Sequence, residues 1–163
     1  MTHIVLIAHN LRSTHNVGSL LRTCDGLGVR VYLTGYTPYP SVKNDARLPH
    51  LQQRITKQIS KTALGAEKTG KWNHNDKVSD VVTQLRNDGY AIVSLEQSKN
   101  AIKLPSYSPP EKIAIIVGRE VEGIETEILA LSDCILEIPM YGKKESYNVT
   151  QAAAMALYHC RFR

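Results

Sequence analysis

The run at residues 113–117, Ile-Ala-Ile-Ile-Val, is almost continuously apolar and limits the possible folds more than any other segment. A strand with one solvated face alternates apolar and polar side chains, whereas a run without alternation is typical of a parallel sheet that is covered on both faces. Shorter apolar runs at residues 4–8, 30–34, 90–95 and 135–138 have a similar character. We therefore expect a buried, mostly parallel sheet.

Segments with helical periodicity separate these runs. The spacing of apolar residues predicts helices over 13–27 and 77–88, each followed or ended by glycine, and further helices over 51–66, 124–131 and 148–160. Residues 35–49 are rich in proline and form an expected loop, residues 68–76 look irregular, and 106–110 read as a turn. Strands that alternate with helices predict one α/β domain over residues 1–163.

The charge is unevenly distributed. The stretch from residue 43 to residue 71 holds seven basic and two acidic residues, which matches the net charge of +5 of the whole chain. A local basic stripe favours a phosphate-backbone partner, although a solvated helix face gives the same pattern. Tyr39 and Trp72 are available for base stacking. The candidate nucleic-acid contacts are Arg12, Lys43, Arg47, Arg54, Lys57, Lys61 and Lys68.

Several classes of protein are disfavoured by the same sequence. No apolar run approaches the roughly 18 residues of a membrane helix, and the start lacks the features of a signal peptide, so we expect no membrane partner and a cytoplasmic location. Cys24, Cys134 and Cys160 are scattered without a C-x-x-C pair. This spacing argues against a disulfide framework and against a zinc site, and predicts buried apolar cysteines.

Three loops that lead from a strand into a helix carry polar residues suited to chemistry. The first contains Asn16 and Arg22, and the second contains Glu120. The third contains Ser146 and Asn148 directly before a helix rich in alanine. In parallel α/β proteins such loops meet at the carboxyl ends of the strands, where ligands bind.

Each loop also has a purely structural interpretation. Asn16, Ser146 or Asn148 could be helix N-caps, Arg22 a surface residue, and the segment around Glu120 a glycine turn with exposed acids. Arg22 has apolar neighbours, which favours an arginine that meets a carboxylate or a phosphate. The glycines fit neither a dinucleotide fingerprint nor a Walker loop, so an NAD or NTP site is poorly supported.

The three loops together resemble motifs one, two and three of the SpoU/TrmH family, RNA ribose 2′-O-methyltransferases of the SPOUT superfamily. The matching blocks are Asn-x-Gly-x-x-x-Arg-Thr at 16–23, Gly-x-Glu-x-x-Gly at 118–123 and Ile-Pro-Met-x-Gly-x-x-x-Ser-x-Asn-Val at 138–149. The resemblance implies an α/β fold with a C-terminal deep trefoil knot, which is rare among proteins. It also implies S-adenosylmethionine as cofactor, no metal, and a homodimer whose active sites draw on both subunits.

The resemblance also implies residue roles. Arg22 matches the catalytic arginine, which in the family's proposed mechanism takes the proton of the ribose 2′-hydroxyl. Because a guanidinium has a pKa above about 12, the alternative is that it only orients phosphate and hydroxyl. The remaining catalytic candidates are Asn16, Glu120, Ser146 and Asn148. The cofactor candidates are Leu95, Gly118, Ile138, Met140, Tyr147 and Asn148.

This chain departs from the family pattern at Tyr147, where leucine is usual, and at Thr150, where serine is frequent. We expect no separate RNA-binding extension, so the catalytic domain itself would capture RNA. The expected substrate is tRNA or else rRNA. Two alternatives are a non-catalytic RNA-binding module with the same fold and a SPOUT methyltransferase that modifies a base.

Overall fold

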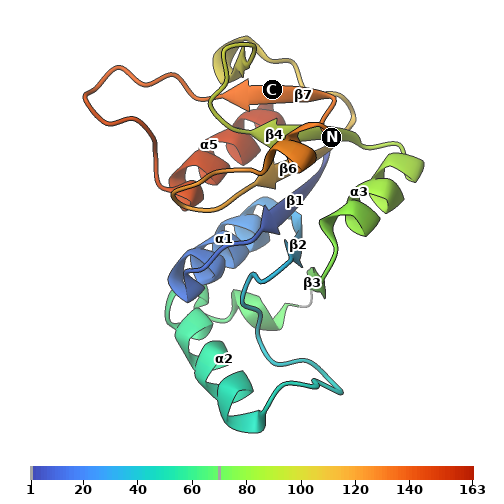
Figure 1. Cartoon of the computed structure of the whole chain (residues 1–163), viewed down its shortest axis with the longest axis vertical. Coiled ribbons are helices and arrows are strands. Elements are labelled where there is room, and N and C mark those ends of the chain that lie inside the picture. The colour runs from blue at the N-terminus through green and yellow to red at the C-terminus, as the bar shows by residue number, and fades with distance from the viewer. Residues whose placement is uncertain (1, 70) are drawn as a thin grey trace.

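The computed structural model describes residues 2–69 and 71–163. Its centre is a seven-stranded sheet with the strand order β3-β2-β1-β6-β4-β7-β5, in which all neighbouring strands are parallel (Figure 1). The strands are β1 (His3–His9), β2 (Arg30–Thr34), β3 (Trp72–Asn75), β4 (Ala91–Leu95), β5 (Ile102–Lys103), β6 (Lys112–Val117) and β7 (Cys134–Glu137). The helices are α1 (Thr14–Leu27), α2 (Pro49–Ala63), η1 (Ala66–Lys68), α3 (Val78–Asn87), η2 (Leu104–Ser106), α4 (Thr126–Leu129) and α5 (Val149–Phe162).

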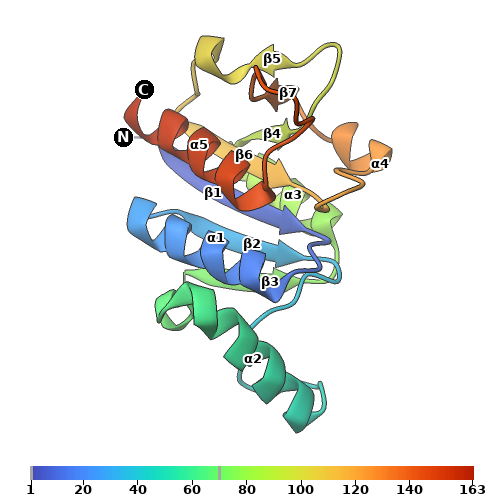
Figure 2. The same cartoon turned by 90° about the vertical axis from the view of Figure 1, so that its left-hand side faces the viewer.

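Both faces of the central strands are buried, as the apolar run in β6 predicts. Ile113, Ile115 and Val117 belong to one core cluster together with residues of α1, α2 and α5. Ala114 and Ile116 belong to a second cluster with residues of α3 and α4. Figure 2 shows α1 and α5 side by side over the first of these faces. The predicted α/β class with a parallel sheet is therefore confirmed, whereas the trefoil knot stays an expectation.

The glycine in the middle of α1 allows α2 to pack directly against it. Gly18 is buried, and a Cβ atom at this position would lie 2.2 Å from Thr62 Oγ1 and 2.3 Å from the carbonyl oxygen of Ile59. The Thr62 hydroxyl donates to the carbonyl oxygen of His15 at 2.8 Å. The close approach of the two helices fixes the position of the basic residues of α2 beside α1.

Two short strands were not expected from the sequence. Residues 68–76 were predicted to be irregular, which is wrong for β3; residue 70 lies outside the described residues. β5 has two exposed residues and lies at the opposite edge of the sheet. Edge strands are solvated on several sides, so their sequences carry no continuous apolar signal.

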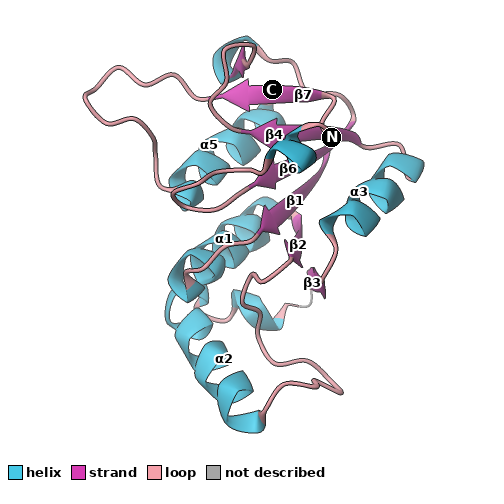
Figure 3. Ribbon diagram, in the orientation of Figure 1, coloured by secondary structure: helices cyan, strands magenta, loops and turns pink. Residues whose placement is uncertain are grey.

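The remaining connections are loops, of which the one after β7 projects furthest from the body (Figure 3). All residues from 141 to 148 in this loop are exposed. The two ends of the chain lie close together, because Arg161 donates to the carbonyl oxygen of Thr2 at 2.7 Å. Cys24 and Cys160 are buried as predicted, and Cys134 is partly buried. Within residues 2–69 and 71–163, no helix is both long and apolar enough to cross a bilayer.

Candidate active site

A cavity opens at the carboxyl ends of three adjacent strands. Leu95 at the end of β4, Val117 at the end of β6 and Leu136 in β7 form its apolar floor. The loop that follows β6 and the end of the loop that precedes α5 form its walls. Carboxyl ends of parallel strands are where α/β proteins bind ligands. The three strands are neighbours only because β6 and β7 join the sheet on either side of β4.

The Glu120 carboxylate joins the loop after β6 to the start of α1. It accepts hydrogen bonds from Asn16 Nδ2 at 3.0 Å, from the backbone N–H of Ser13 at 3.1 Å and from that of Arg12 at 3.3 Å. Burial alone would raise the pKa of Glu120, but these hydrogen bonds outweigh it and leave the pKa below its usual value. Glu120 is therefore a stable anion at neutral pH, placed to orient Asn16.

Asn148 brings the third loop to the same place. Its side-chain Nδ2 lies 3.5 Å from Asn16 Oδ1, and its Oδ1 accepts from the backbone N–H of Thr150 at 2.9 Å. Asn148 is thus the N-cap of α5 and a neighbour of Asn16 at once. At α1 the cap is Ser13, whose hydroxyl accepts from the Asn16 backbone N–H. The Asn16 side chain is therefore free of capping and available to Glu120 and Asn148.

Arg22 lies apart from this cluster. The sequence favoured an arginine held by a carboxylate or a phosphate, but the structure places it on the exposed side of α1. It lines a different cavity, of about 610 Å³, together with Lys61 and Thr62 of α2. Six residues along a helix of 3.6 residues per turn lead to a different face, which accounts for the separation from Asn16. The structure groups Asn16, Glu120 and Asn148, and leaves Arg22 outside the group.

A second polar cluster flanks the cavity loop. Glu125 accepts from Asn10 Nδ2 at 2.8 Å and lies 3.7 Å from both Arg119 Nε and His9 Nε2. The other ring nitrogen of His9 lies 2.9 Å from the Thr34 hydroxyl. Burial lowers the pKa of His9, with Glu125 opposing and Arg119 adding to the shift. This cluster ties the end of the loop to the ends of β1 and β2.

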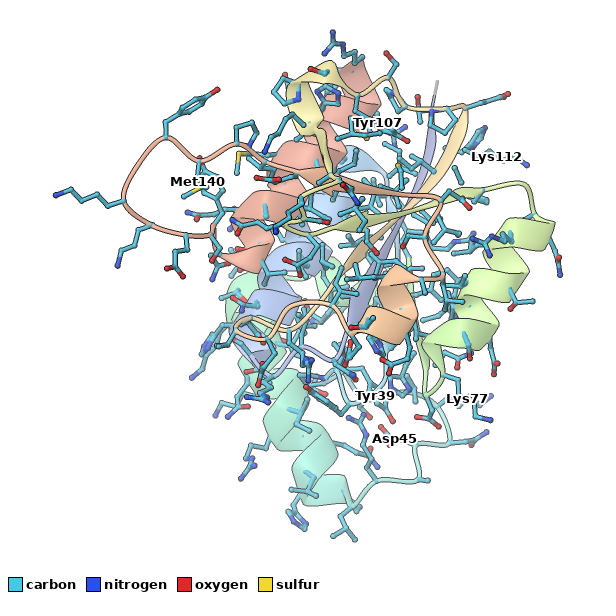
Figure 4. All side chains as sticks on the ribbon, turned by 45° about the horizontal axis from the view of Figure 1, so that its top comes forward. Tyr39, Asp45, Lys77, Tyr107, Lys112 and Met140 are labelled. Atoms are coloured by element: carbon cyan, nitrogen blue, oxygen red, sulfur yellow. The ribbon has the colours of Figure 1, made fainter. Side chains whose placement is uncertain are left out.

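The predicted cofactor residues divide into two groups. Leu95, Gly118, Ile138 and Tyr147 line the cavity, and so does the catalytic candidate Ser146. Among the described residues, its lining does not include Met140 or Asn148. Figure 4 places Met140 in the loop that follows β7. The cofactor roles of these residues stay predictions.

The sequence did not identify Glu96, Gln97 and Arg119 as part of the site, although all three line the cavity; Gly123, the last residue of the second motif, lines it as well. Glu96 and Gln97 directly follow Leu95, so a polar pair after a buried strand was the available signal. That signal has meaning only once β4 is known to lie between β6 and β7.

The basic stretch forms a cationic face on α2. Arg54, Lys57 and Lys61 are spaced three and four residues apart, and all three are exposed. This spacing puts them on one side of the helix. Lys43 and Lys68 are also exposed. The face adjoins α1, because Lys61 lines the same cavity as Arg22.

Two of the proposed RNA contacts are engaged within the chain. Arg47 donates to Asp45 at 2.5 and 2.9 Å and to the carbonyl oxygen of Tyr39 at 3.0 Å. Arg12 is paired with Glu122 at 2.9 Å, on the exposed surface. A carboxylate two residues away already holds the Arg47 guanidinium, so an RNA phosphate would have to share it with Asp45; the RNA contact of Arg47 stays a prediction.

Tyr39 is also unavailable for base stacking. Its ring stacks on His74 with centroids 3.8 Å apart, and the Arg47 guanidinium lies 3.6 Å from the Tyr39 centroid. Two groups this close to one centroid must occupy opposite faces of the ring. Tyr39 and Asp45 lie near each other at one end of the molecule in Figure 4. The cluster stabilises the long loop between β2 and α2 and occupies both faces of the Tyr39 ring.

Comparison with known proteins gives a consistent result. The model of the SpoU rRNA Methylase family matches residues 3–158. The tRNA (guanosine(18)-2′-O)-methyltransferase of Aquifex aeolicus is 29% identical over 161 residues, which cover 97% of this chain and 68% of that protein. The 23S rRNA (guanosine-2′-O-)-methyltransferase RlmB of Neisseria meningitidis is 27% identical over 158 residues, covering 97% of this chain and 58% of that protein.

Solved structures show the same fold. The AdoMet-bound rRNA methyltransferase from Sinorhizobium meliloti superimposes with a TM-score of 0.80 and 17% identity, over 98% of this chain and 56% of that one. The chain thus spans between about half and two thirds of the length of the proteins compared.

Proposed function

Because the chain belongs to the SpoU rRNA methylase family, we propose that it transfers a methyl group from S-adenosylmethionine to a ribose 2′-hydroxyl of RNA. The observation that carries this proposal is the hydrogen-bonded group of Asn16, Glu120 and Asn148 beside the cavity. It joins the three loops that match the family motifs. The substrate is tRNA or rRNA, in keeping with the names of the two relatives. A cytoplasmic location is part of the same proposal.

The chemistry of the cavity fits S-adenosylmethionine. Leu95, Val117 and Leu136 offer an apolar floor for an adenine ring. Gln97 and backbone groups of the surrounding loop offer partners for hydroxyl and ammonium groups. The cofactor supplies an electrophilic methyl group. The protein therefore has to hold the ribose hydroxyl in line with that methyl group and assist removal of the hydroxyl proton. No metal is required for this chemistry.

The proposed role of the polar group is orientation of the nucleotide to be methylated. Glu120 is charged and accepts from Ser13, Arg12 and Asn16, so its proposed role is to fix the Asn16 side chain. Asn16 and Asn148 then present amide groups next to Glu120, which lines the cavity. Their donors and acceptors suit a ribose hydroxyl or a phosphate.

We propose a homodimer in which Arg22 of one protomer reaches the site of its partner, because within its own chain Arg22 lies outside the group of Asn16, Glu120 and Asn148. It lines a separate cavity between α1 and α2. α5 also exposes apolar side chains along one side, with Tyr158 61% and Phe162 67% exposed and their rings 4.6 Å apart. An exposed aromatic pair on a closing helix is what a subunit interface would bury. In the dimer, Arg22 of one protomer completes the site of its partner.

The first test is methyl transfer from labelled S-adenosylmethionine to total small RNA and to ribosomal RNA, each digested to nucleosides. A 2′-O-methyl nucleoside from one pool establishes the reaction and names the substrate class. A methylated base would instead indicate the base-modifying alternative. Cofactor binding without transfer to any RNA, assembled ribosomal particles included, would indicate the non-catalytic module.

The second test is Arg22→Ala. We expect methyl transfer to fall by at least a hundredfold, in the range of removed catalytic groups, while calorimetry gives an unchanged affinity for S-adenosylmethionine. Because Arg22 is exposed and does not line the cofactor cavity, the variant should fold normally. Full transfer by Arg22→Ala would refute its assigned role.

A further inference from the structure

Carboxylates hold the loop between β6 and α4 from several sides. Glu120 fastens it to α1, and Glu125 fastens its end to Asn10. The third fastening comes from the cavity side: Glu96 Oε2 accepts a hydrogen bond from the backbone N–H of Ile124 at 3.0 Å. Glu96 lies directly after β4 and lines the cavity. None of the family motifs described above contains it.

Both oxygens of Glu96 are used by backbone groups. While Oε2 accepts from Ile124, Oε1 accepts from the N–H of Gln97 at 2.8 Å. The carboxylate therefore bridges the end of β4 and the end of the cavity loop. A glutamine could satisfy only one of these donors, because its amide nitrogen would face the other.

Gly123 makes room for this carboxylate. Its φ is +70°, and a Cβ atom would lie 2.2 Å from Glu96 Oε2 and 3.0 Å from Glu96 Cδ. The same glycine exchanges backbone hydrogen bonds of 3.2 Å with Arg119, which close the loop on itself. A side chain at this position would thus push the Glu96 carboxylate away and strain the loop.

We propose that Glu96 is a positioning residue that sets the loop from Gly118 to Ile124 against the cofactor cavity. This loop is one wall of the cavity and also carries Glu120, so a single carboxylate fixes the wall on one side and the polar group of Asn16 on the other. The effect on S-adenosylmethionine rests on the proposed function. The role of Glu96 in holding the loop rests on the structure alone.

The test compares Glu96→Gln and Glu96→Ala with Glu127→Gln, which makes the same chemical change on the exposed surface of α4. Amide hydrogen exchange by NMR reports the loop directly. Glu96→Ala should exchange the Ile124 amide at least tenfold faster than wild type, and Glu127→Gln should not. An unchanged Ile124 amide in Glu96→Ala would overturn the proposal.

Cofactor affinity measured by calorimetry is the second readout. Loss of a hydrogen bond to a charged group predicts roughly tenfold or greater weakening in Glu96→Gln, with a thermal midpoint several degrees below wild type because the same bond stabilises the folded chain. Wild-type affinity in both Glu96 variants would overturn the positioning role. If wild type itself binds no S-adenosylmethionine, the proposed function fails, while the exchange experiment still decides the role of Glu96 in the loop.

A double-mutant cycle separates this contact from general damage. Gly123→Ala should accelerate exchange of the Ile124 amide more in wild type than in Glu96→Ala, because the carboxylate that its Cβ would meet is then absent. Equal effects in the two backgrounds would show that the contact between Gly123 and Glu96 is unimportant, and would overturn the proposal.

Discussion

Substitution of Gly18 by alanine tests the packing of α2 on α1. In a helix interior, alanine is normally the more stable of the two residues by about 0.5–1 kcal/mol. At Gly18 the added Cβ would lie 2.2 Å from Thr62 Oγ1, 2.3 Å from the Ile59 carbonyl oxygen and 2.9 Å from the Ala63 nitrogen. The two helices must therefore move apart.

The size of the effect follows from these contacts. Overpacking typically costs about 1–3 kcal/mol, and two of the three atoms that Gly18→Ala would meet belong to the backbone, so no rotamer change removes them. Because backbone atoms cannot give way, the upper part of this range, about 2–3 kcal/mol, applies. After subtraction of the helix-propensity gain of about 0.5–1 kcal/mol, we expect a net loss of about 1–2.5 kcal/mol in the free energy of unfolding. For a chain of this size that corresponds to a fall of roughly 2–10 °C in the melting temperature.

Gly26→Ala is the matched control. Gly26 lies in the same helix, and a Cβ there would meet no atom within 4 Å. This variant should gain up to about 1 kcal/mol, so the two substitutions change stability in opposite directions. Urea unfolding measures both. If Gly18→Ala is as stable as Gly26→Ala, the argument from close helix packing is refuted. Trimming the side chain with Thr62→Ala should recover only part of the loss, because the contact with the Ile59 carbonyl persists.

Two further predictions concern RNA and pH. In Lys57→Ala/Lys61→Ala we expect weaker RNA binding, and a plot of log binding constant against log salt concentration whose slope is reduced by about one unit for each lost phosphate contact. Filter binding over a range of salt concentrations measures this slope. An unchanged slope would show that RNA binds to another surface. The pKa of His9 is lowered by burial, opposed by Glu125 and aided by Arg119, so the unfolded chain takes up a proton first as the pH falls. The contribution of His9 to the free energy of unfolding should be fully present above about pH 6.5 and decrease below it. In His9→Asn, urea midpoints should fall less over the same pH range.

The sequence predicts the central strands well, because a strand buried on both faces consists almost entirely of apolar residues. It predicts the longer helices from the spacing of their apolar residues. β6 is an example, with apolar residues from Ile113 to Val117 directed alternately into the two core clusters. β3 escaped prediction because its edge position permits Asn73, His74 and Asn75. Edge strands are defined by their pairing partner, which a local pattern does not specify.

The site was predictable in its residues but not in its geometry. The motif resemblance brought Asn16, Glu120 and Asn148 together correctly, although they are more than 100 residues apart at the extremes. It gave no sign that Arg22 lies in another cavity, since that depends on the face of α1 covered by α2. Likewise, the charge count could not reveal that Asp45 occupies Arg47.

The strand order has a consequence for how the chain folds during synthesis. β1 lies between β2 and β6, so one of its edges is paired early and the other waits for a strand about 80 residues beyond β2. Long-range parallel pairing of this kind is slow, because the loop must close before the contacts form. Until β6 emerges from the ribosome, the nascent chain exposes an apolar strand edge that attracts aggregation or a chaperone. Because the cavity needs β6, it is one of the last parts of the molecule to form.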